Sequence, residues 1–425
     1  MRPGARAAAA IEILTDLETR KRPAADAVKD WMLTHRFAGS KDRAEIGDIV
    51  FGALRWKASS AWRLGDDTPR AWVLGALRWG FGGDPDVLAA SLVDDPHAPE
   101  ALSENERIAL LGAQLDGAPP WVRGDYPEWL DASFARAFGD TRAEEGASLA
   151  APAPLDLRAN TLKTDRSMLI QALRESPRLK TTAVPAPHAP NGVRIAWSRG
   201  GSFAWASEQS FQKGWFEVQD EGSQIAALLS GVEPGMQVAD VCAGGGGKTL
   251  ALAALMQNKG QIFAHDVDGR RLAPLRERLD RAGARNVQIR APVRERDALE
   301  DLRGKMDVVL VDAPCSGSGT WRRNPDSKWR LRHASLEARR REQAEALALA
   351  APLVKAGGRL LYVTCSVLPE ENEDALAAFR QTHADFVDAR LEVREIPGHT
   401  RGAALQMTAL TTGCDGFFVA ALRRA

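Results

Sequence analysis

The sequence predicts an α/β protein whose C-terminal half is a doubly wound, mainly parallel sheet. Residues 218–425 alternate segments of helical character with short β-rich apolar runs near residues 236, 261, 286, 306, 358 and 417. Strands that alternate with helices are typical of parallel sheets joined by right-handed crossovers. One glycine turn and two cysteines directly follow three of these runs, at the strand ends where open α/β sheets bind ligands.

Three segments are expected along the 425 residues. Residues 1–135 are rich in Ala, Leu and Trp, with apolar residues at helical spacing such as Ile46 and Ile49, and are predicted to form an all-α domain. Residues 136–217 combine a helix, strands and a Pro-rich loop, which predicts a small α/β subdomain. Residues 218–425 form the sheet domain.

Composition limits the class of protein. The 56 basic and 56 acidic residues give a formal net charge of zero, so any nucleic-acid site must be a local basic patch. No long uncharged apolar run and no signal-peptide pattern are evident, so we expect a cytoplasmic protein without a membrane span. A monomer is expected because the pattern shows no exposed apolar stripe.

A candidate RNA-binding patch follows the second cysteine of the chain. Basic side chains crowd this stretch, with two tryptophans between them that could stack on bases. Its members are Trp321, Arg322, Arg323, Lys328, Trp329, Arg330, Arg332, Arg339, Arg340 and Arg341. A solvated basic helix face is an equal alternative for residues 339–341.

The four cysteines lie in the second half of the chain, and their spacing is typical of neither zinc sites nor disulfide frameworks. No metal site is predicted. Cys315, in Asp-Ala-Pro-Cys-Ser-Gly, and Cys365, in Thr-Cys-Ser, each follow a β-rich run. Because a thiolate is a strong nucleophile, this pair predicts cysteine chemistry on one small flat substrate. Cys242 and Cys414 are expected to be packed side chains.

A glycine turn stands between the strand-like run 237–241 and an Ala/Leu helix. It consists of Cys242, Ala243, Gly244, Gly245, Gly246, Gly247 and Lys248. Such a turn lets the backbone approach a ligand and directs helix N–H groups at it, which predicts a nucleoside ligand. A P-loop is excluded because Cys242 stands where it needs glycine, and the dinucleotide fingerprint would need its third glycine at Thr249 or Leu250.

An acidic residue follows the next strand-like run, Gln261 to Ala264. In such sheets this position reaches the hydroxyl pair of a ribose, so we expect Asp266 to contact the ribose. Asp268 is the second candidate. Either residue could instead simply cap the helix that follows.

Together these motifs resemble the Sun (Fmu, RsmB-like) family of RNA cytosine-5 methyltransferases. The resemblance covers residues 125–425 and includes four further blocks, namely Pro154 to Lys163, Gln219 to Gln224, Arg322 to Asp326 and Asp415 to Phe418. It implies a class I methyltransferase sheet, S-adenosylmethionine as cofactor and RNA as partner, with ribosomal RNA favoured and transfer RNA possible. In addition, Ser40 to Arg55 resembles the NusB-like helical domain of bacterial members.

The resemblance also implies roles for individual residues. Cys365 would attack carbon 6 of cytosine, after which carbon 5 takes the methyl group. Cys315 would be the second cysteine, needed for product release. Asp312 and Lys248 match positions beside the target base, where they would stabilise the charge that develops as the thiolate adds.

Cofactor binding is implied for residues 242–248, Asp266 and Asp312. This chain departs from the family pattern in two places. Within the turn, two glycines replace a small residue and a proline. After the third strand, residues 289–293 lack the acidic side chain that usually meets the adenine.

Two alternative functions are carried forward. A DNA cytosine-5 methyltransferase would use the thiol of its Pro-Cys loop, here Cys315, and has no counterpart of Cys365. A non-catalytic RNA-binding or ribosome-assembly factor could keep the fold without turnover.

Overall fold

The computed structural model describes residues 1–177, 182–199, 201, 204–293, 297–391 and 396–425. The chain divides into two compact units, which we call the helical unit and the sheet unit. The helical unit consists of Met1–Pro152, Trp197–Ser202 and Trp321–Leu331, and the sheet unit consists of Ala153–Ala196, Phe203–Thr320 and Arg332–Ala425. The chain therefore leaves the sheet unit and returns to it within the C-terminal half of the sequence.

The helical unit is built around a core of residues that recur at helical spacing, including Ile13, Leu14, Ile46 and Val50. Its helices are α1 (Pro3–Arg20), α2 (Ala24–Thr34), α3 (Ser40–Arg55), α4 (Lys57–Leu64), α5 (Pro69–Gly75), α6 (Pro85–Val93), α7 (Glu104–Gly112), α8 (Pro120–Arg123), α9 (Asp131–Phe138), α10 (Arg142–Ala150) and α16 (Pro325–Arg330). A π-helical turn, Ala76–Gly80, extends α5. Helix α9 crosses the predicted boundary at residue 135 and α10 follows it, yet both lie in this unit. A NusB-like identity for this region stays a prediction.

The segment Trp321–Leu331, which contains α16, packs into the helical unit. Trp321 is 1% exposed and stacks on Phe134 with ring centroids 5.9 Å apart. Lys328, also 1% exposed, donates from Nζ to the carbonyl oxygens of Arg55, at 2.8 Å, and Asp125. Burial lowers the pKa of Lys328 to about 7 and raises the pKa of Asp125 to about 6.

This packing corrects part of the predicted RNA patch. Trp321, Arg322 and Lys328 are buried, and the indole of Trp329 donates to the carbonyl of Leu54 at 2.7 Å. The sequence pattern was misleading because an aromatic and basic stretch also suits a segment that buries its rings and places its cations on backbone carbonyls. On α17 (His333–Ala350), Arg339 and Arg340 form exposed ion pairs with Glu342 and Glu337.

The main sheet of the sheet unit has the strand order β11-β12-β13-β9-β8-β5-β6-β7, with β10 beside β13. Its strands are β5 (Gln237–Asp240), β6 (Gln261–His265), β7 (Val287–Arg290), β8 (Met306–Asp312), β9 (Val354–Thr364), β10 (Phe386–Ala389), β11 (His399–Arg401), β12 (Ala404–Met407) and β13 (Phe417–Arg424). Strands β5 to β9 pair in parallel, and β13 runs antiparallel to β9. The predicted mainly parallel α/β sheet is confirmed, and β10 to β12 add an antiparallel edge that was not predicted.

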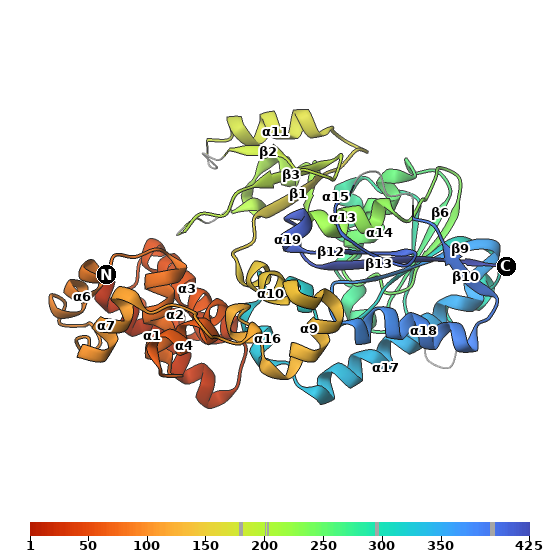
Figure 1. Ribbon diagram of the computed structural model, residues 1–425. Helices are drawn as coiled ribbons and strands as arrows, with labels where there is room; N and C mark the ends of the chain where they lie inside the picture. The colour runs from red at the N-terminus through yellow and green to blue at the C-terminus, as the bar shows by residue number, and fades with distance from the viewer. Residues whose placement is uncertain (178–181, 200, 202–203, 294–296, 392–395) are drawn as a thin grey trace. The chain divides into compact units, whose positions relative to one another are not determined.

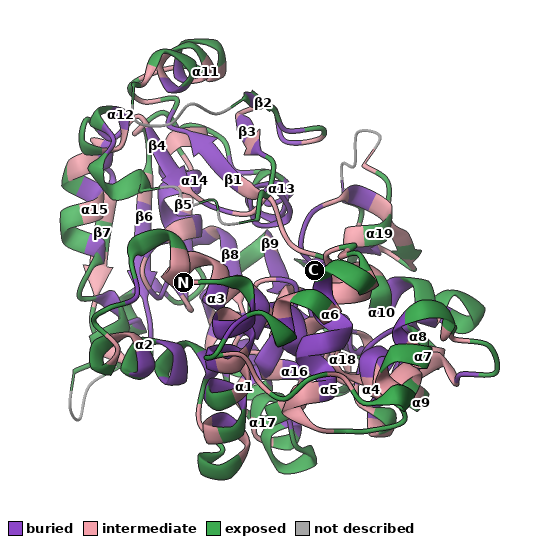
Figure 2. Cartoon of the chain, turned by 90° about the vertical axis from the view of Figure 1, so that its left-hand side faces the viewer, coloured by how far each residue is buried: buried purple, intermediate pink, exposed green. Residues whose placement is uncertain are grey.

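Helices cover both faces of this sheet, as the alternation of side chains along its strands requires. In Figure 1, α13 (Glu221–Leu228), α14 (Gly247–Leu255) and α15 (Leu275–Ala282) lie on one side, and α17 and α18 (Glu373–Thr382) lie on the other. Val308 and Leu310 pack with α13 and α14, whereas Val309 and Val311 pack with α17. Figure 2 shows the central strands as buried.

A smaller antiparallel sheet precedes the main one, with strand order β2-β3-β1-β4. It consists of β1 (Leu155–Ala159), β2 (Ala183–Pro185), β3 (Gly192–Ile195) and β4 (Phe216–Val218), with helices α11 (Arg166–Glu175) and α12 (Gln209–Gln212). Helix α11 closes its core through Leu169 and Leu173, which pack against Leu157, Val193 and Phe216.

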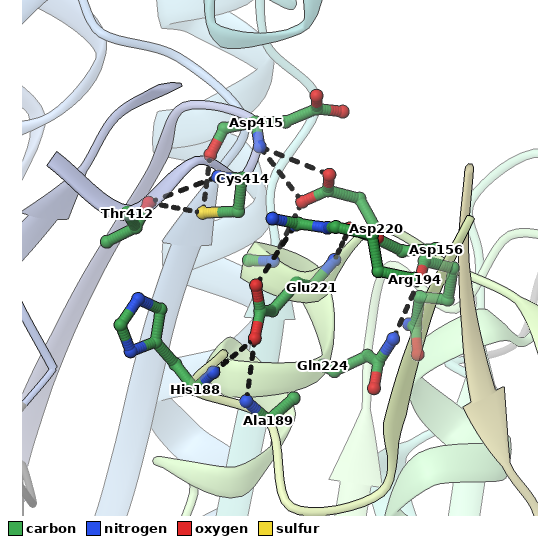
Figure 3. Close-up of polar contacts among 12 residues, drawn as sticks. Asp156, His188, Ala189, Arg194, Asp220, Glu221, Gln224, Thr412, Cys414 and Asp415 are labelled. Atoms are coloured by element: carbon green, nitrogen blue, oxygen red, sulfur yellow. Dashed lines mark hydrogen bonds and ion pairs between the residues drawn. The ribbon is translucent and has the colours of Figure 1, made fainter. Parts of the chain in front are cut away.

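A polar cluster ties the small sheet to the main domain (Figure 3), and we call it the tie cluster. Arg194 of β3 donates to both carboxylate oxygens of Asp156, at 2.7 and 2.8 Å, and to Glu221 at 3.0 Å. Glu221 also accepts from the backbone N–H of Ala189 at 2.8 Å. Next to it, the N–H of Asp415 donates to Asp220 at 3.1 Å. Two of the family-like blocks, Gln219 to Gln224 and Asp415 to Phe418, are thus joined in one structural cluster.

Within the described residues, no helix has the length and apolar character needed to cross a membrane.

Candidate active site

The two predicted cysteines meet at the carboxyl ends of neighbouring parallel strands. Cys315 follows β8 and Cys365 follows β9, and these strands pair up to Asp312 opposite Val363. The two sulfur atoms lie 3.3 Å apart, and both residues are half-buried. Contact with Cys365 and burial both raise the pKa of the Cys315 thiol.

Hydrogen bonds between the two loops fix this approach. The N–H of Gly319 donates to the carbonyl of Cys365 at 3.0 Å, and the N–H of Val367 donates to Oγ of Ser318 at 2.9 Å. A Cβ on Gly319 would lie 2.1 Å from the carbonyl oxygen of Gly416, so only glycine permits the close approach of these two segments. The first loop is therefore held against both the second loop and the C-terminal block.

Lys248 and Asp312 form an ion pair beside the thiols, with 2.8 Å between Nζ and Oδ1. Lys248 is 6% exposed and lies in the first turn of α14, whereas Asp312 is 34% exposed at the end of β8. The ammonium group also lies 5.1 Å from the ring centroid of Phe417. The structure thus brings both predicted residues together and leaves the carboxylate accessible to a ligand.

The glycine turn has the predicted arrangement of strand, turn and helix. Gly244 and Gly246 have positive φ angles of 50° and 84°, which favour glycine, and a Cβ on Gly246 would lie 2.1 Å from Leu275. The N–H of Ala243 donates to the carbonyl of His265 at 2.8 Å, which fixes the turn on β6. Burial raises the pKa of the Cys242 thiol, which makes Cys242 a poor nucleophile.

Asp266 lies against this turn and is 1% exposed. Its Oδ2 accepts from the N–H of Gly244 at 3.0 Å and forms an ion pair with the guanidinium of Arg271, also at 3.0 Å, and its Oδ1 accepts from the N–H of Asp268. Asp268, in contrast, caps the 3-10 turn Gly269–Leu272. The geometry therefore places Asp266 at the glycine turn, while its predicted contact with ribose stays a prediction.

Asp240, a buried carboxylate that we did not predict, lies beneath the turn. It is 1% exposed at the end of β5 and accepts from Oγ1 of Thr249 at 2.7 Å, while its Oδ1 finds no partner among the described residues. Burial raises its pKa from 3.8 to about 7. The signal in the sequence was an aspartate at the last position of the strand that leads into the glycine turn.

Glu371, a second residue that sequence reasoning missed, lies behind the two cysteine loops. It is fully buried in the 3-10 turn Pro369–Glu371, and its carboxylate accepts from residues of both loops. No pattern in the sequence marks it, because Pro369, Glu370 and Glu371 are ordinary for an exposed turn.

The chain is similar to known ribosomal RNA methyltransferases. Residues 227–423 match the family model for 16S rRNA methyltransferase RsmB/F, and residues 126–199 match the model for its ferredoxin-like domain. The ribosomal RNA small subunit methyltransferase B of Pseudomonas syringae pv. tomato is 33% identical over 421 residues, covering 90% of this chain and 89% of the relative. The probable enzyme of that name from Synechocystis sp. is 36% identical over 304 residues, covering 71% and 67%.

Two solved structures have a fold similar to that of this chain. The crystal structure of PH0851 matches with a TM-score of 0.73 and 26% identity, covering 100% of both chains. A methyltransferase homolog protein from Pyrococcus horikoshii matches with a TM-score of 0.60 and 28% identity, covering 72% of this chain and 98% of that one.

A doubly wound sheet with a glycine turn and a strand-end site, matched by these relatives, defines an S-adenosylmethionine-dependent methyltransferase. More specifically, the chain belongs to the RsmB/F family of ribosomal RNA methyltransferases. The predicted family and cofactor are confirmed.

Proposed function

We propose that this protein is an RNA (cytosine-5) methyltransferase that acts on the RNA of the small ribosomal subunit through a covalent cysteine adduct. The observation that carries the proposal is the 3.3 Å approach of the Cys315 and Cys365 sulfurs at the ends of β8 and β9. Two thiols at one strand-end site can act in turn on one base. The names of the relatives support ribosomal RNA as the substrate.

In this mechanism, the thiolate of Cys365 adds to carbon 6 of cytosine, so that carbon 5 becomes nucleophilic. Carbon 5 would then form a bond to the methyl group as the methyl–sulfur bond of the donor breaks and leaves its electron pair on sulfur. A base then removes the proton on carbon 5. The electron pair of that C–H bond restores the double bond between carbons 5 and 6 and expels Cys365 as thiolate. Cys315 would act at this release step.

The pair of Lys248 and Asp312 is suited to the charge that appears when the thiolate adds. Electron density moves onto the exocyclic oxygen and ring nitrogen of the base. The ammonium group of Lys248 stabilises it directly, and the carboxylate of Asp312 would accept a hydrogen bond from the ring nitrogen once that nitrogen has taken up a proton. Because Lys248 is already fixed by Asp312 at 2.8 Å, little reorganisation would be needed.

The residues around the glycine turn fit the cofactor. S-adenosylmethionine supplies an electrophilic methyl group when bound. The unpartnered Oδ1 of Asp240 offers an acceptor for an ammonium group, and Asp266 offers carboxylate oxygens beside Gly244 for hydroxyl groups. We propose these two residues, with residues 242–248 and Asp312, as the cofactor site.

The proposal is tested by transfer of labelled methyl from S-adenosylmethionine to unmodified small-subunit ribosomal RNA and, separately, to unmodified transfer RNA. The wild-type protein is expected to label ribosomal RNA at carbon 5 of cytosine. Cys365→Ala is expected to abolish the transfer, and Cys315→Ala is expected to leave an RNA adduct that survives denaturation of the protein.

Other outcomes would assign other functions. Label in transfer RNA alone would change the substrate. Transfer that survives Cys365→Ala but not Cys315→Ala would support the DNA-type use of the Pro-Cys thiol. No transfer and no binding of S-adenosylmethionine in calorimetry would leave a binding or assembly factor.

A further inference from the structure

The carboxylate of Glu371 joins the two cysteine loops directly. Its Oε1 accepts from the backbone N–H of Ser316 at 2.7 Å and from the side-chain amide of Gln343 at 3.1 Å. Its Oε2 accepts from the hydroxyl groups of Ser316 and Ser366. These serines directly follow Cys315 and Cys365, so one carboxylate binds the residue next to each thiol.

The direction of these hydrogen bonds follows from the donors available. The hydroxyl of Ser366 accepts from the N–H of Leu368 at 3.0 Å and lies 3.0 Å from the hydroxyl of Ser318. Because its single hydrogen goes to Glu371, Ser318 must be the donor to Ser366. The carboxylate therefore receives four neutral donors, the full number that its two oxygens accept well.

No cation among the described residues forms an ion pair with this carboxylate. Burial raises the pKa of Glu371, and its hydrogen bonds to Ser316, Ser366 and Gln343 oppose that rise. The charge of Glu371 also acts on the thiol of Cys315. Contact with Cys365 and burial raise the pKa of Cys315, and the charge of Glu371 adds a further contribution.

The other titratable groups near Cys315 do not cancel that charge. Strand β9 contributes Cys365 and Tyr362, and burial raises the pKa of Tyr362, which keeps it neutral. On the same loop, Asp312 is paired with Lys248. Helix α17 contributes the neutral Gln343, which also donates to the carbonyl of Pro314 at 2.9 Å.

We propose that Glu371 is a positioning residue that holds the two loops in register and keeps Cys315 as a thiol, so that its S–H donates to the sulfur of Cys365. The proposal rests on the proposed function, in which Cys365 reacts as the thiolate. The S–H of Cys315 would stabilise that thiolate before it adds to the base and again when Cys365 leaves at release. One buried carboxylate would thus make two adjacent cysteines chemically different.

The test is the pH dependence of iodoacetamide alkylation at Cys315, measured by peptide mass spectrometry in protein that carries Cys365→Ala. Only the thiolate reacts, so the midpoint of the rate profile reports the ionisation of Cys315. Adding Glu371→Gln is expected to lower that midpoint by about one pH unit, because a like charge that acts on Cys315 has been removed. Glu345→Gln, an exposed position on α17, is the matched control and should leave it unchanged.

Glu371→Asp separates charge from position. The shorter side chain keeps the charge, so the midpoint should stay near that of the parent protein. It cannot reach both serines, so in protein with both cysteines kcat for methyl transfer should fall while KM for RNA changes little. A midpoint that does not move in Glu371→Gln, or that falls equally in Glu371→Asp, would overturn the proposal. Because alkylation needs neither RNA nor cofactor, this result is independent of whether the proposed function holds.

Discussion

Two buried glutamates of the sheet unit, Glu221 and Glu371, join chain segments in different ways. Glu221, in the tie cluster, faces the guanidinium of Arg194, which also binds Asp156. Glu371, behind the thiols, receives two hydroxyls, one amide and one backbone N–H. Both residues are 0% exposed. They differ in whether a cation balances their charge.

That difference separates a structural role from a functional one. Glu221 shares the guanidinium of Arg194 with Asp156, so its charge is partly compensated, and it is only the last of several causes that raise the pKa of Cys414. We therefore assign Glu221 mainly to the connection between the small sheet and the main domain. A carboxylate that is only hydrogen-bonded keeps its charge, which then acts on titratable neighbours. The two glutamates therefore differ in how far a cation compensates their charge, and we expect the uncompensated one to act more strongly on a neighbouring thiol.

The largest effect is expected from removing the cation of the tie cluster. Arg194→Met leaves Asp156 and Glu221 buried without compensation, so the free energy of unfolding should fall by about 3–5 kcal/mol. Urea denaturation followed by circular dichroism measures this change. Alkylation of Cys315 should keep its pH midpoint, and a shifted midpoint would break the proposed division between the two glutamates.

A third buried acid, Asp240, extends the comparison, because its protonation makes the stability of the protein depend on pH. Because burial raises its pKa from 3.8 to about 7, the stability linked to its protonated form is fully present below pH 3.8 and is lost as the pH rises through 7. The loss is about 4 kcal/mol at most. Asp240→Asn should flatten the pH dependence of unfolding across this window, and parallel curves for the two proteins would contradict the prediction.

The two glutamates should also differ when each is neutralised. Glu221→Gln removes one of the two carboxylates that pair with Arg194. In Glu371→Gln the amide takes the place of a carboxylate whose donors are neutral, and the serine hydroxyls can rotate to accept from the new amide. We expect a loss of about 1–2 kcal/mol in unfolding free energy for Glu371→Gln and a larger loss for Glu221→Gln. Thermal unfolding of both variants under identical conditions provides the comparison, and the reverse order would count against it.

The smallest effect is expected for charges in solvent. Replacing both Arg339 and Arg340 by alanine removes two exposed ion pairs on α17 and should change the unfolding free energy by less than about 1 kcal/mol. Salt titration of RNA binding by the same variant tests whether this helix face carries the remaining part of the predicted patch.

The sequence predicted the elements whose signal is local. The β-rich runs, the glycine turn and the two strand-end cysteines lie as expected, because periodicity and strand order follow from neighbouring residues. The partners of Glu371 come from three separate segments, and no local pattern reveals a buried acid. The burial of Trp321 and Lys328 was missed for the same reason, because composition alone does not separate a solvated basic stretch from a docked one.

The return of Trp321–Leu331 to the helical unit has a consequence for biosynthesis. Chains fold as they leave the ribosome, usually from the N-terminus onward. Here the helical unit lacks Trp321 and Lys328 until translation has passed residue 331, although its helices α1 to α10 are made much earlier. Residues 1–152 of the helical unit therefore stay incompletely packed until a segment from the middle of the sheet unit's sequence has been synthesised.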